Sequence, residues 1–540
     1  MIPHETFAAP KTIGVFGQPP RRGQARLLSV LEEAFPVRFE RRQNKERRGL
    51  DAALIVGSAA IGDLQGLPRL FFASAADLPR NPAEIDLAED PPLDRRLRRR
   101  SFEEECGGAF LPLHCTAGDV AVATCGGRAV WTFQADGGRR HLVATSLPGL
   151  GERETLRHHL RPGRFLALLA LVHFIRELIG PAEWTPPPLR AAFLLDDPNL
   201  HWPTYGYVDY AAIAGHAAVH DYHLAVAMIP LDARLVHREA AGIFRAHPKR
   251  LSVLVHGNDH VHHELARERS EPATEALVAH ALRRIESFER RTQIPVARVM
   301  APPHGRCSSE TAHALLRLGF DALCVSRPYP WLDVPPASRP LAGWDPAELV
   351  AGGLPVLPRY PLARPRAELA FRAFLGQPLI LYGHHGDLAA GLESFAAAAA
   401  DIGSLGDVTW TSLRQIALSN VATRRNGAAL QIRMFTRRAR IELPDNIENV
   451  QVEVPHYGAD RSLESLVAHS PDAPPAEAQL GEPIPVESGR SLELALVRRD
   501  AIDHHLRWIR RRTTPWPVLR RAGTETRDRL LPLVRRVANA

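Results

Sequence analysis

The feature that most constrains the fold is a series of seven short apolar runs that follows a proline cluster at residues 184–190. Segments of helix length separate most of the runs, and one of them, residues 274–291, repeats apolar residues at helical spacing. Strand and helix units in succession predict a parallel (β/α) barrel, complete or slightly irregular, with its chemistry where strands end and loops begin. The seven predicted strands are residues 192–196, 224–230, 251–255, 297–302, 321–326, 354–360 and 378–383.

Further domains are expected on both sides of this barrel, because 540 residues exceed what one core organises. Residues 1–183 alternate apolar runs with polar stretches and predict an α/β domain, but they lack both phosphate-binding glycine motifs, so its role stays open. Short runs of β character after the barrel predict a small antiparallel β domain. The predicted division is 1–183, 184–422 (barrel), 423–505 (β-rich) and 506–540 (basic tail).

Composition excludes several classes of protein. The longest apolar stretch, residues 164–180, contains charged residues and predicts a buried helix rather than a membrane span. Five cysteines without a CxxC pair argue against a disulfide framework and a thiolate zinc site. The net charge of +7 is nearly all arginine, and no nucleic-acid-binding motif accompanies it. The first residues contain no visible export signal, so we expect a cytoplasmic protein with no nucleic-acid partner.

Adjacent carboxylates, Asp196 and Asp197, directly follow the first predicted barrel strand. Burying two such groups together is costly unless a cation or a shared proton offsets the charge. The alternative is a pair that caps a turn before Pro198.

Histidines follow two other predicted strands. His256 and His260 are four residues apart, so their imidazoles can approach one ion, and a carboxylate from another strand would complete the ligand set. His384 and His385 follow the last strand, where one imidazole could protonate a leaving group near neutral pH. The alternatives are surface histidines and a histidine that caps a strand.

Over about residues 191–420, the order of these motifs resembles the polysaccharide deacetylase superfamily, with the segment APPHG (301–305) between the two histidine motifs. The resemblance implies a distorted (β/α) barrel and a divalent transition metal, expected to be zinc, with cobalt, nickel and manganese as alternatives. It also implies metal ligands Asp197, His256 and His260. Asp196 would be the base that activates water, and His384 or His385 the general acid.

The sequence departs from the family pattern at three places near the site, the first being Leu194 and Leu195 where the family has an aromatic before the Asp pair. Ala301 stands where the family has an arginine that orients the base, and Gly257 stands where it has serine or threonine. Arg298 or Arg306 could reach inward in place of the missing arginine. The departures at Ala301 and Gly257 motivate the alternative of a glycan-binding barrel that has lost catalysis.

The expected activity is metal-dependent hydrolysis of a non-peptide C–N bond, removing an acyl group, expected to be N-acetyl, from an amino sugar or related amide. A non-sugar C–N bond is the alternative substrate. The sugar is expected to be an intracellular precursor that is lipid- or nucleotide-linked. Six residues are weaker candidates for substrate binding, although half of them or more could simply pack their loops. They are Asn199, His201, Tyr205, Pro303, His304 and Trp331.

The tail is rich in arginine and carries Trp508 and Trp516, which predicts peripheral contact with an anionic membrane. The alternative is a helix that packs on the barrel. Pro515, Pro517 and Pro532 are expected to interrupt any long amphipathic helix there.

Overall fold

The computed structural model divides the chain into two compact units, each described by itself below. The first contains Met1–Thr185, Val334–Asp345 and Arg366–Leu375, and the second contains Pro186–Asp333, Pro346–Pro365 and Gly376–Ala540. The residues described are 9–42, 47–57, 64, 66–73, 81–89, 93–105, 110, 113, 115, 116, 118–135, 138–180, 183–326, 339–363, 367–455, 461–470, 474–506 and 515–538.

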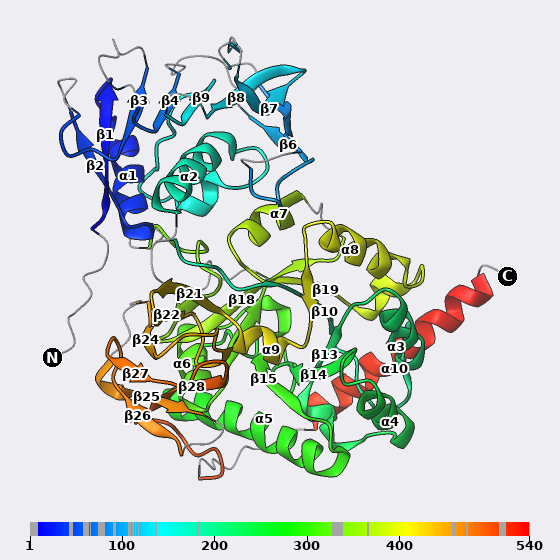
Figure 1. Ribbon diagram of the computed structural model, residues 1–540. Coiled ribbons are helices and arrows are strands. Elements are labelled where there is room, and N and C mark those ends of the chain that lie inside the picture. Colours follow the sequence, from blue (N-terminus) through cyan, green and yellow to red (C-terminus); the bar gives the residue numbers. More distant parts are fainter. Residues whose placement is uncertain are drawn as a thin grey trace. The chain divides into compact units, whose positions relative to one another are not determined.

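The first unit is built on a nine-stranded mixed sheet in the order β2-β1-β3-β4-β9-β8-β7-β5-β6, parallel as far as β9 and antiparallel beyond it (Figure 1). Helix α2 is the predicted buried helix, and no helix among the described residues is long and apolar enough to cross a membrane. The elements are β1 (Lys11–Gly17), α1 (Arg22–Ala34), β2 (Val37–Arg41), β3 (Ala52–Val56), β4 (Arg69–Phe72), β5 (Ala83–Leu87), β6 (Ser101–Glu104), β7 (Val120–Cys125), β8 (Arg128–Gln134), β9 (Arg140–Val143), α2 (Leu166–Ile179) and α7 (Ala367–Phe374).

Seven parallel strands of the second unit close into a barrel, in the order β10-β13-β14-β15-β16-β18-β19 and back to β10. All seven predicted strands are present, which confirms the fold class. The strands are apolar on both faces because the barrel interior and the outer helices bury them. They are β10 (Leu189–Asp196), β13 (Leu224–Met228), β14 (Leu251–Val255), β15 (Val296–Met300), β16 (Ala322–Val325), β18 (Leu354–Pro361) and β19 (Leu379–Gly383).

Helices and short strands surround this barrel. Helices α3 (Tyr210–Val219), α4 (Arg238–Ala246), α5 (Glu271–Thr292), α6 (Ser309–Arg317), α8 (Glu393–Gly403) and α9 (Leu413–Leu418) follow its strands. Two short strands extend the sheet: β17 (Glu348–Val350) pairs with β18, and β20 (Val408–Trp410) pairs with β10. A short hairpin, β11 (Thr204–Tyr205) and β12 (Val208–Asp209), lies in the loop after β10.

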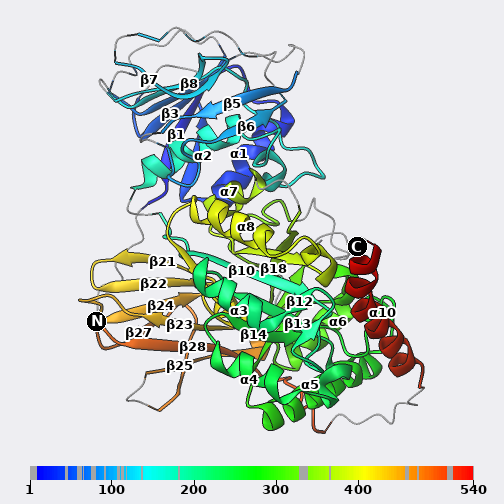
Figure 2. The ribbon, with the colours of Figure 1, turned by 90° about the vertical axis from the view of Figure 1, so that its right-hand side faces the viewer.

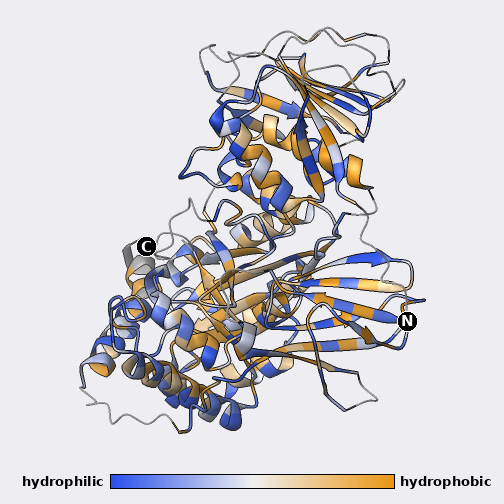
Figure 3. Ribbon diagram, turned by 90° about the vertical axis from the view of Figure 1, so that its left-hand side faces the viewer, coloured by the Kyte–Doolittle hydropathy of each residue, from blue (hydrophilic) through white to orange (hydrophobic). Residues whose placement is uncertain are grey.

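Two four-stranded sheets, ordered β21-β22-β24-β27 and β23-β28-β25-β26, share one apolar core after the barrel (Figure 2). Buried side chains alternate with more exposed ones along β23, β24 and β28, and hydrophobic and hydrophilic residues alternate along strands of the sandwich in Figure 3. All strand pairs are antiparallel except β22 with β24. The predicted β-rich region is therefore a small sandwich. Its strands are β21 (Val421–Asn426), β22 (Ala429–Met434), β23 (Arg438–Glu442), β24 (Asn449–Glu453), β25 (Glu464–His469), β26 (Ala476–Ala478), β27 (Pro483–Pro485) and β28 (Ser491–Arg498).

The chain ends in one long helix, α10 (Trp516–Ala538), which lies beside the barrel (Figure 1). The expectation that prolines interrupt this segment is wrong. Pro515 precedes the helix, Pro517 lies in its first turn, where a missing N–H costs nothing, and Pro532 is accommodated inside it. Trp508 lies outside the described residues.

Candidate active site

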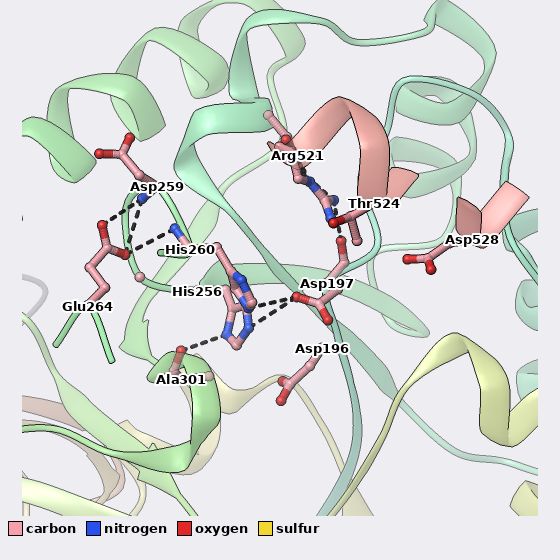
Figure 4. A network of polar contacts seen from close by, with 12 residues as sticks. Asp196, Asp197, His256, Asp259, His260, Glu264, Ala301, Arg521, Thr524 and Asp528 are labelled. Carbon is pink, nitrogen blue, oxygen red and sulfur yellow. Dashed lines mark hydrogen bonds and ion pairs between the residues drawn. The ribbon is translucent and has the colours of Figure 1, made fainter. Parts of the chain in front are cut away.

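The predicted metal ligands come together at the rim formed by the carboxyl ends of the barrel strands (Figure 4). Asp197 follows β10, and His256 and His260 follow β14. Oδ1 of Asp197 lies 3.1 Å from Nε2 of His260 and 3.5 Å from Nε2 of His256. One ligand atom from each residue lies within 4.8 Å of the others.

The hydrogen bonds of His256 leave its inward nitrogen free to bind a cation. Its Nδ1 lies 2.7 Å from the carbonyl oxygen of Ala301, and a carbonyl only accepts, so Nδ1 carries the proton. In the neutral ring, the Nε2 lone pair then faces the Asp197 carboxylate, and either a bound cation or a second proton on the ring supplies the positive charge that this arrangement favours. Burial alone would lower the pKa of His256, but Asp196 and Asp197 raise it. A backbone carbonyl that fixes the outer nitrogen is also the usual support of a metal-binding histidine.

Asp197 has the electrostatics of a cation ligand. Its Oδ1 is buried and makes no hydrogen bond of ordinary geometry among the described residues. Burial alone would raise the pKa of this carboxyl, but His256 and His260 outweigh burial and hold the pKa well below its usual value. These residues therefore fit a divalent cation that prefers imidazole and carboxylate donors.

A residue that the sequence reasoning missed, Glu264, shapes the loop that carries the two histidines. It is 0% exposed, and its carboxylate accepts hydrogen bonds from the backbone N–H groups of Asn258, Asp259 and His260. A Cβ at Gly257 would lie 2.7 Å from Oε2 of Glu264, and φ of this glycine is +68°. Glycine in place of the family's hydroxyl residue therefore makes room for the carboxylate that organises the loop.

Backbone strain is concentrated at the same rim. Nine described residues other than glycine have positive φ, and four of them are Asp197, His260, His263 and His304. Such conformations are costly and persist where the surrounding structure imposes them, commonly at functional sites. Their clustering supports a site at this rim.

The buried base candidate, Asp196, is held by Arg359 from β18. The guanidinium donates a hydrogen bond of 2.6 Å to Oδ1 of Asp196, and both side chains are almost fully buried. Burial alone would raise the pKa of Asp196, but Arg359, followed by His256, lowers it below its ordinary value. Arg359 thus supplies the positive charge that Ala301 cannot.

The alternatives considered for that role do not fill it. Arg298 bonds instead to Glu289, at 2.7 and 3.0 Å, and Arg306 is exposed. The sequence reasoning missed Arg359, although an arginine inside the otherwise apolar run 354–360 was a usable signal.

Replacing Arg359 by Met is expected to lower kcat/KM about 10- to 100-fold, because the carboxylate of Asp196 is then no longer held in its orientation. Losing the guanidinium also raises the pKa of Asp196, so the acidic limb of the pH–rate profile should move to higher pH. Breaking a buried ion pair costs about 3–5 kcal/mol of folding stability, so thermal unfolding is measured in parallel.

The control variant, Arg359→Lys, keeps the charge. It should retain the position of the acidic limb and lose less of the rate. A Met variant with the wild-type rate and profile would contradict this role.

The two candidate acids differ in their surroundings. His384 is exposed and lies close enough to Asp196 to lower the pKa of that carboxyl. His385 is buried, stacks on Tyr207 and places Nε2 3.5 Å from Asp528 of α10. Its Nδ1 packs against Gly206, where an added Cβ would lie 2.3 Å away. Burial, only partly offset by Asp528, lowers the pKa of His385.

Three of the predicted substrate-binding residues contact α10. His201 bonds to Glu525 at 2.9 Å, the Tyr205 hydroxyl donates to Asp528 at 2.8 Å, and buried Asn199 lies 3.4 Å from Arg529. No local sequence pattern indicates these long-range contacts.

The remaining candidates lie near the histidine loop or outside the described residues. Pro303 is buried, and its ring lies 2.7 Å from where a Cβ of Gly257 would be. His304 is exposed, with its ring 5.4 Å from that of His260. Desolvation and then the neighbouring histidines lower the pKa of His304 to about 4. Trp331 lies outside the described residues.

A second group of potential ligands, His141, His173 and Glu177, fits a metal less well. Buried Trp131 donates its indole N–H to Nδ1 of His141 at 3.2 Å, so Nδ1 carries the lone pair. The proton is therefore on Nε2, which donates to Glu177 at 2.9 Å. This nitrogen has no lone pair to offer, so we interpret the group as a buried hydrogen-bond network.

Comparison with known proteins gave structural matches only. No family model and no curated protein sequence matches this chain. The chain is similar to a solved structure from Mycobacterium smegmatis that is provisionally assigned as a polysaccharide deacetylase, with 16% identity and a TM-score of 0.31 over 44% of this chain and 94% of that one.

Two other similar structures come from the same group of enzymes. A family 4 carbohydrate esterase from Streptomyces lividans, in complex with acetate, has 10% identity and a TM-score of 0.25 over 41% of this chain and 88% of its own. A polysaccharide deacetylase from Bacillus cereus has 12% identity and a TM-score of 0.23 over 42% and 91%. Polysaccharide deacetylases are the family that the motifs of residues 191–420 resemble. The proposals below rest on the residues of this chain.

Proposed function

We propose that the barrel is a metal-dependent hydrolase that removes an acyl group, expected to be N-acetyl, from an amino sugar or a related amide. The observation that carries this proposal is the meeting of Asp197, His256 and His260 at one point, with the protons of His256 arranged for cation binding. The expected cation is zinc or another divalent transition metal.

Different residues of the chain have different roles in the proposed hydrolysis. When bound, the cation would polarise the substrate carbonyl and lower the pKa of water. Asp196, kept ionised and oriented by Arg359, takes the proton of the attacking water. Glu264 holds the histidine loop in the conformation that presents both imidazoles.

We assign the general acid to His384 rather than His385. A leaving group must reach the acid, and His384 is exposed directly after β19, which pairs with β10 so that Leu195 lies opposite Gly383 at the same rim. His385 is buried, with Nε2 facing Asp528 at 3.5 Å and Nδ1 enclosed against Gly206 without a hydrogen-bond partner among the described residues, so a leaving group cannot reach it. His385 is therefore a positioning residue that fits the loop after β10 against the loop after β19.

His384→Ala is expected to lower kcat about 10²- to 10⁴-fold on an acetamide, whose amine leaves only when protonated. On a 4-nitrophenyl ester the same variant should stay close to the wild-type rate, because nitrophenolate leaves without a proton. His385→Ala serves as the matched control and should lower both rates by a similar factor. Equal losses on the two substrates for His384→Ala would remove it from the acid role.

The two departures that motivated a catalytically inactive glycan-binding barrel have structural counterparts. Arg359 replaces the arginine absent at Ala301, and Glu264 occupies the space beside Gly257. We therefore favour an enzyme. The substrate class is tested with metal-loaded protein on N-acetylated amino sugars and on linear and cyclic amides that are not sugars. Turnover of the sugars alone supports the proposal, and turnover of the other amides alone assigns a non-sugar C–N bond.

A further inference from the structure

Helix α10 is attached to the barrel by a charged face. Arg521 binds the carboxylate of Asp232 at 2.8 Å and the backbone carbonyl of Asp197 at 2.7 Å. Arg520 donates to the backbone carbonyl of His260, and Asp528 accepts from Tyr205. Arg521 and Asp528 are buried among these partners, close to the candidate metal ligands (Figure 4).

The opposite face of α10 is apolar and exposed. Trp516, Leu519, Leu530 and Val534 are 64%, 63%, 50% and 63% exposed, and their spacings of three, eleven and four residues place them on one stripe. Of the twelve large apolar side chains that are exposed among the described residues, six lie on this helix. Apart from Arg527, the described charged side chains of α10 contact the barrel while the apolar stripe faces outward, which is the reverse of an ordinary surface helix.

We propose that the outward stripe of α10, formed by Trp516, Leu519, Leu530 and Val534, binds an anionic lipid bilayer. Large apolar side chains exposed together on one helix face mark an interaction site. An amphipathic helix with tryptophan and leucine on one face, flanked by arginine, lies in the headgroup region of a membrane.

Charge selects an anionic membrane over a second copy of the chain. Arg520, Arg521 and Arg529 of α10 bond to the barrel, whereas Arg527 is two-thirds exposed beside the stripe. In a symmetric dimer the same stripe would face itself, so Arg527 would approach its own copy. Anionic headgroups instead attract each arginine near the surface.

The same helix that binds lipid also holds the loops of the candidate active site. The carbonyls of Asp197 and His260 are both fixed by arginines of α10. A membrane-bound α10 would therefore hold the rim of the barrel close to the lipid surface, where a lipid-linked substrate would lie.

The test is co-sedimentation of the full chain with vesicles of phosphatidylcholine alone and of phosphatidylcholine mixed with phosphatidylglycerol, at low and high salt. The stripe variant is Leu519→Glu, Leu530→Glu and Val534→Glu together. The matched control introduces the same three charges at exposed apolar positions elsewhere, Val219→Glu, Leu235→Glu and Val497→Glu. Each of the six side chains is 49% exposed or more, so the new charges need not be buried. Circular dichroism checks that both variants fold.

We expect binding to the anionic vesicles that weakens at high salt, and a loss of at least about tenfold in the partition coefficient of the stripe variant but not of the control. Absence of binding at low salt, or equal binding of the stripe variant, would overturn the proposal. A wild-type dimer that the stripe variant makes monomeric, without vesicle binding, would assign the stripe to a second copy. No substrate is used, so the result is independent of the proposed hydrolysis.

Discussion

Asp196→Asn is expected to lower kcat about 10²- to 10⁴-fold while the protein keeps its metal. Asn has nearly the same shape as Asp and can still accept a hydrogen bond from Arg359, but its amide cannot take a proton from water. Asp196 is not among the three side chains whose ligand atoms meet, so metal binding should survive.

The measurement combines steady-state kinetics on an acetamide with elemental analysis of the same protein sample. Glu264→Gln is an informative companion, because it disturbs the histidine loop without touching the base. We expect it to weaken metal binding, whereas Asp196→Asn should not. Full activity of metal-loaded Asp196→Asn would exclude this residue as the base.

His256→Ala is expected to remove both bound metal and turnover. Losing a residue that only supports a ligand commonly weakens metal binding 10- to 100-fold, so losing a ligand itself should weaken it by at least about 100-fold. The change also leaves the carboxylate of Asp197 without one of its two imidazole partners.

Metal affinity is measured by titrating zinc into the chelator-treated variant, with the wild type alongside. His220→Ala is the control, since His220 is exposed at the end of α3 and lies far along the chain from the ligand motifs. Zinc binding to His256→Ala with wild-type affinity would show that this histidine is not a ligand.

The barrel could be predicted from sequence because each of its strands is a short, continuous apolar run with helix-length chain after it. Parallel strands that are buried on both faces have continuous apolar sequences, as β13 (Leu224–Met228) and β14 (Leu251–Val255) illustrate. The carboxyl ends of the strands lie on one rim, so the strand ends predicted that the carboxylate pair Asp196–Asp197 would meet His256 and His260. The choice of Asp197 as the ligand came from the family resemblance.

Contacts between residues far apart in the sequence could not be predicted in this way. Arg359 reaches Asp196 across 163 positions, because β18 and β10 lie on either side of β19 in the barrel, and no local pattern specifies that pairing. In the sequence, Glu264 follows two histidines and would be expected on the surface like other polar residues. Its burial depends on the path of the loop around it.

The tail forms the helix on the barrel that was the alternative to a membrane-binding segment, but its prolines do not interrupt it as expected. Prolines and arginines there suggested an interrupted basic tail, yet Arg521 and Asp528 are buried against the barrel. Their burial depends on partners such as Asp232 and Tyr205, some 300 residues earlier in the chain, as the intervals of 289 and 323 positions show.

Elemental analysis of the full-length wild-type protein, after removal of metal with a chelator and dialysis against zinc, tests the central claim most directly. We expect close to one zinc ion per chain, held by Asp197, His256 and His260, together with recovery of hydrolytic activity on an acetylated amino sugar. The same treatment is repeated with cobalt, nickel and manganese in place of zinc. A protein that remains folded but retains none of the four metals would contradict the account.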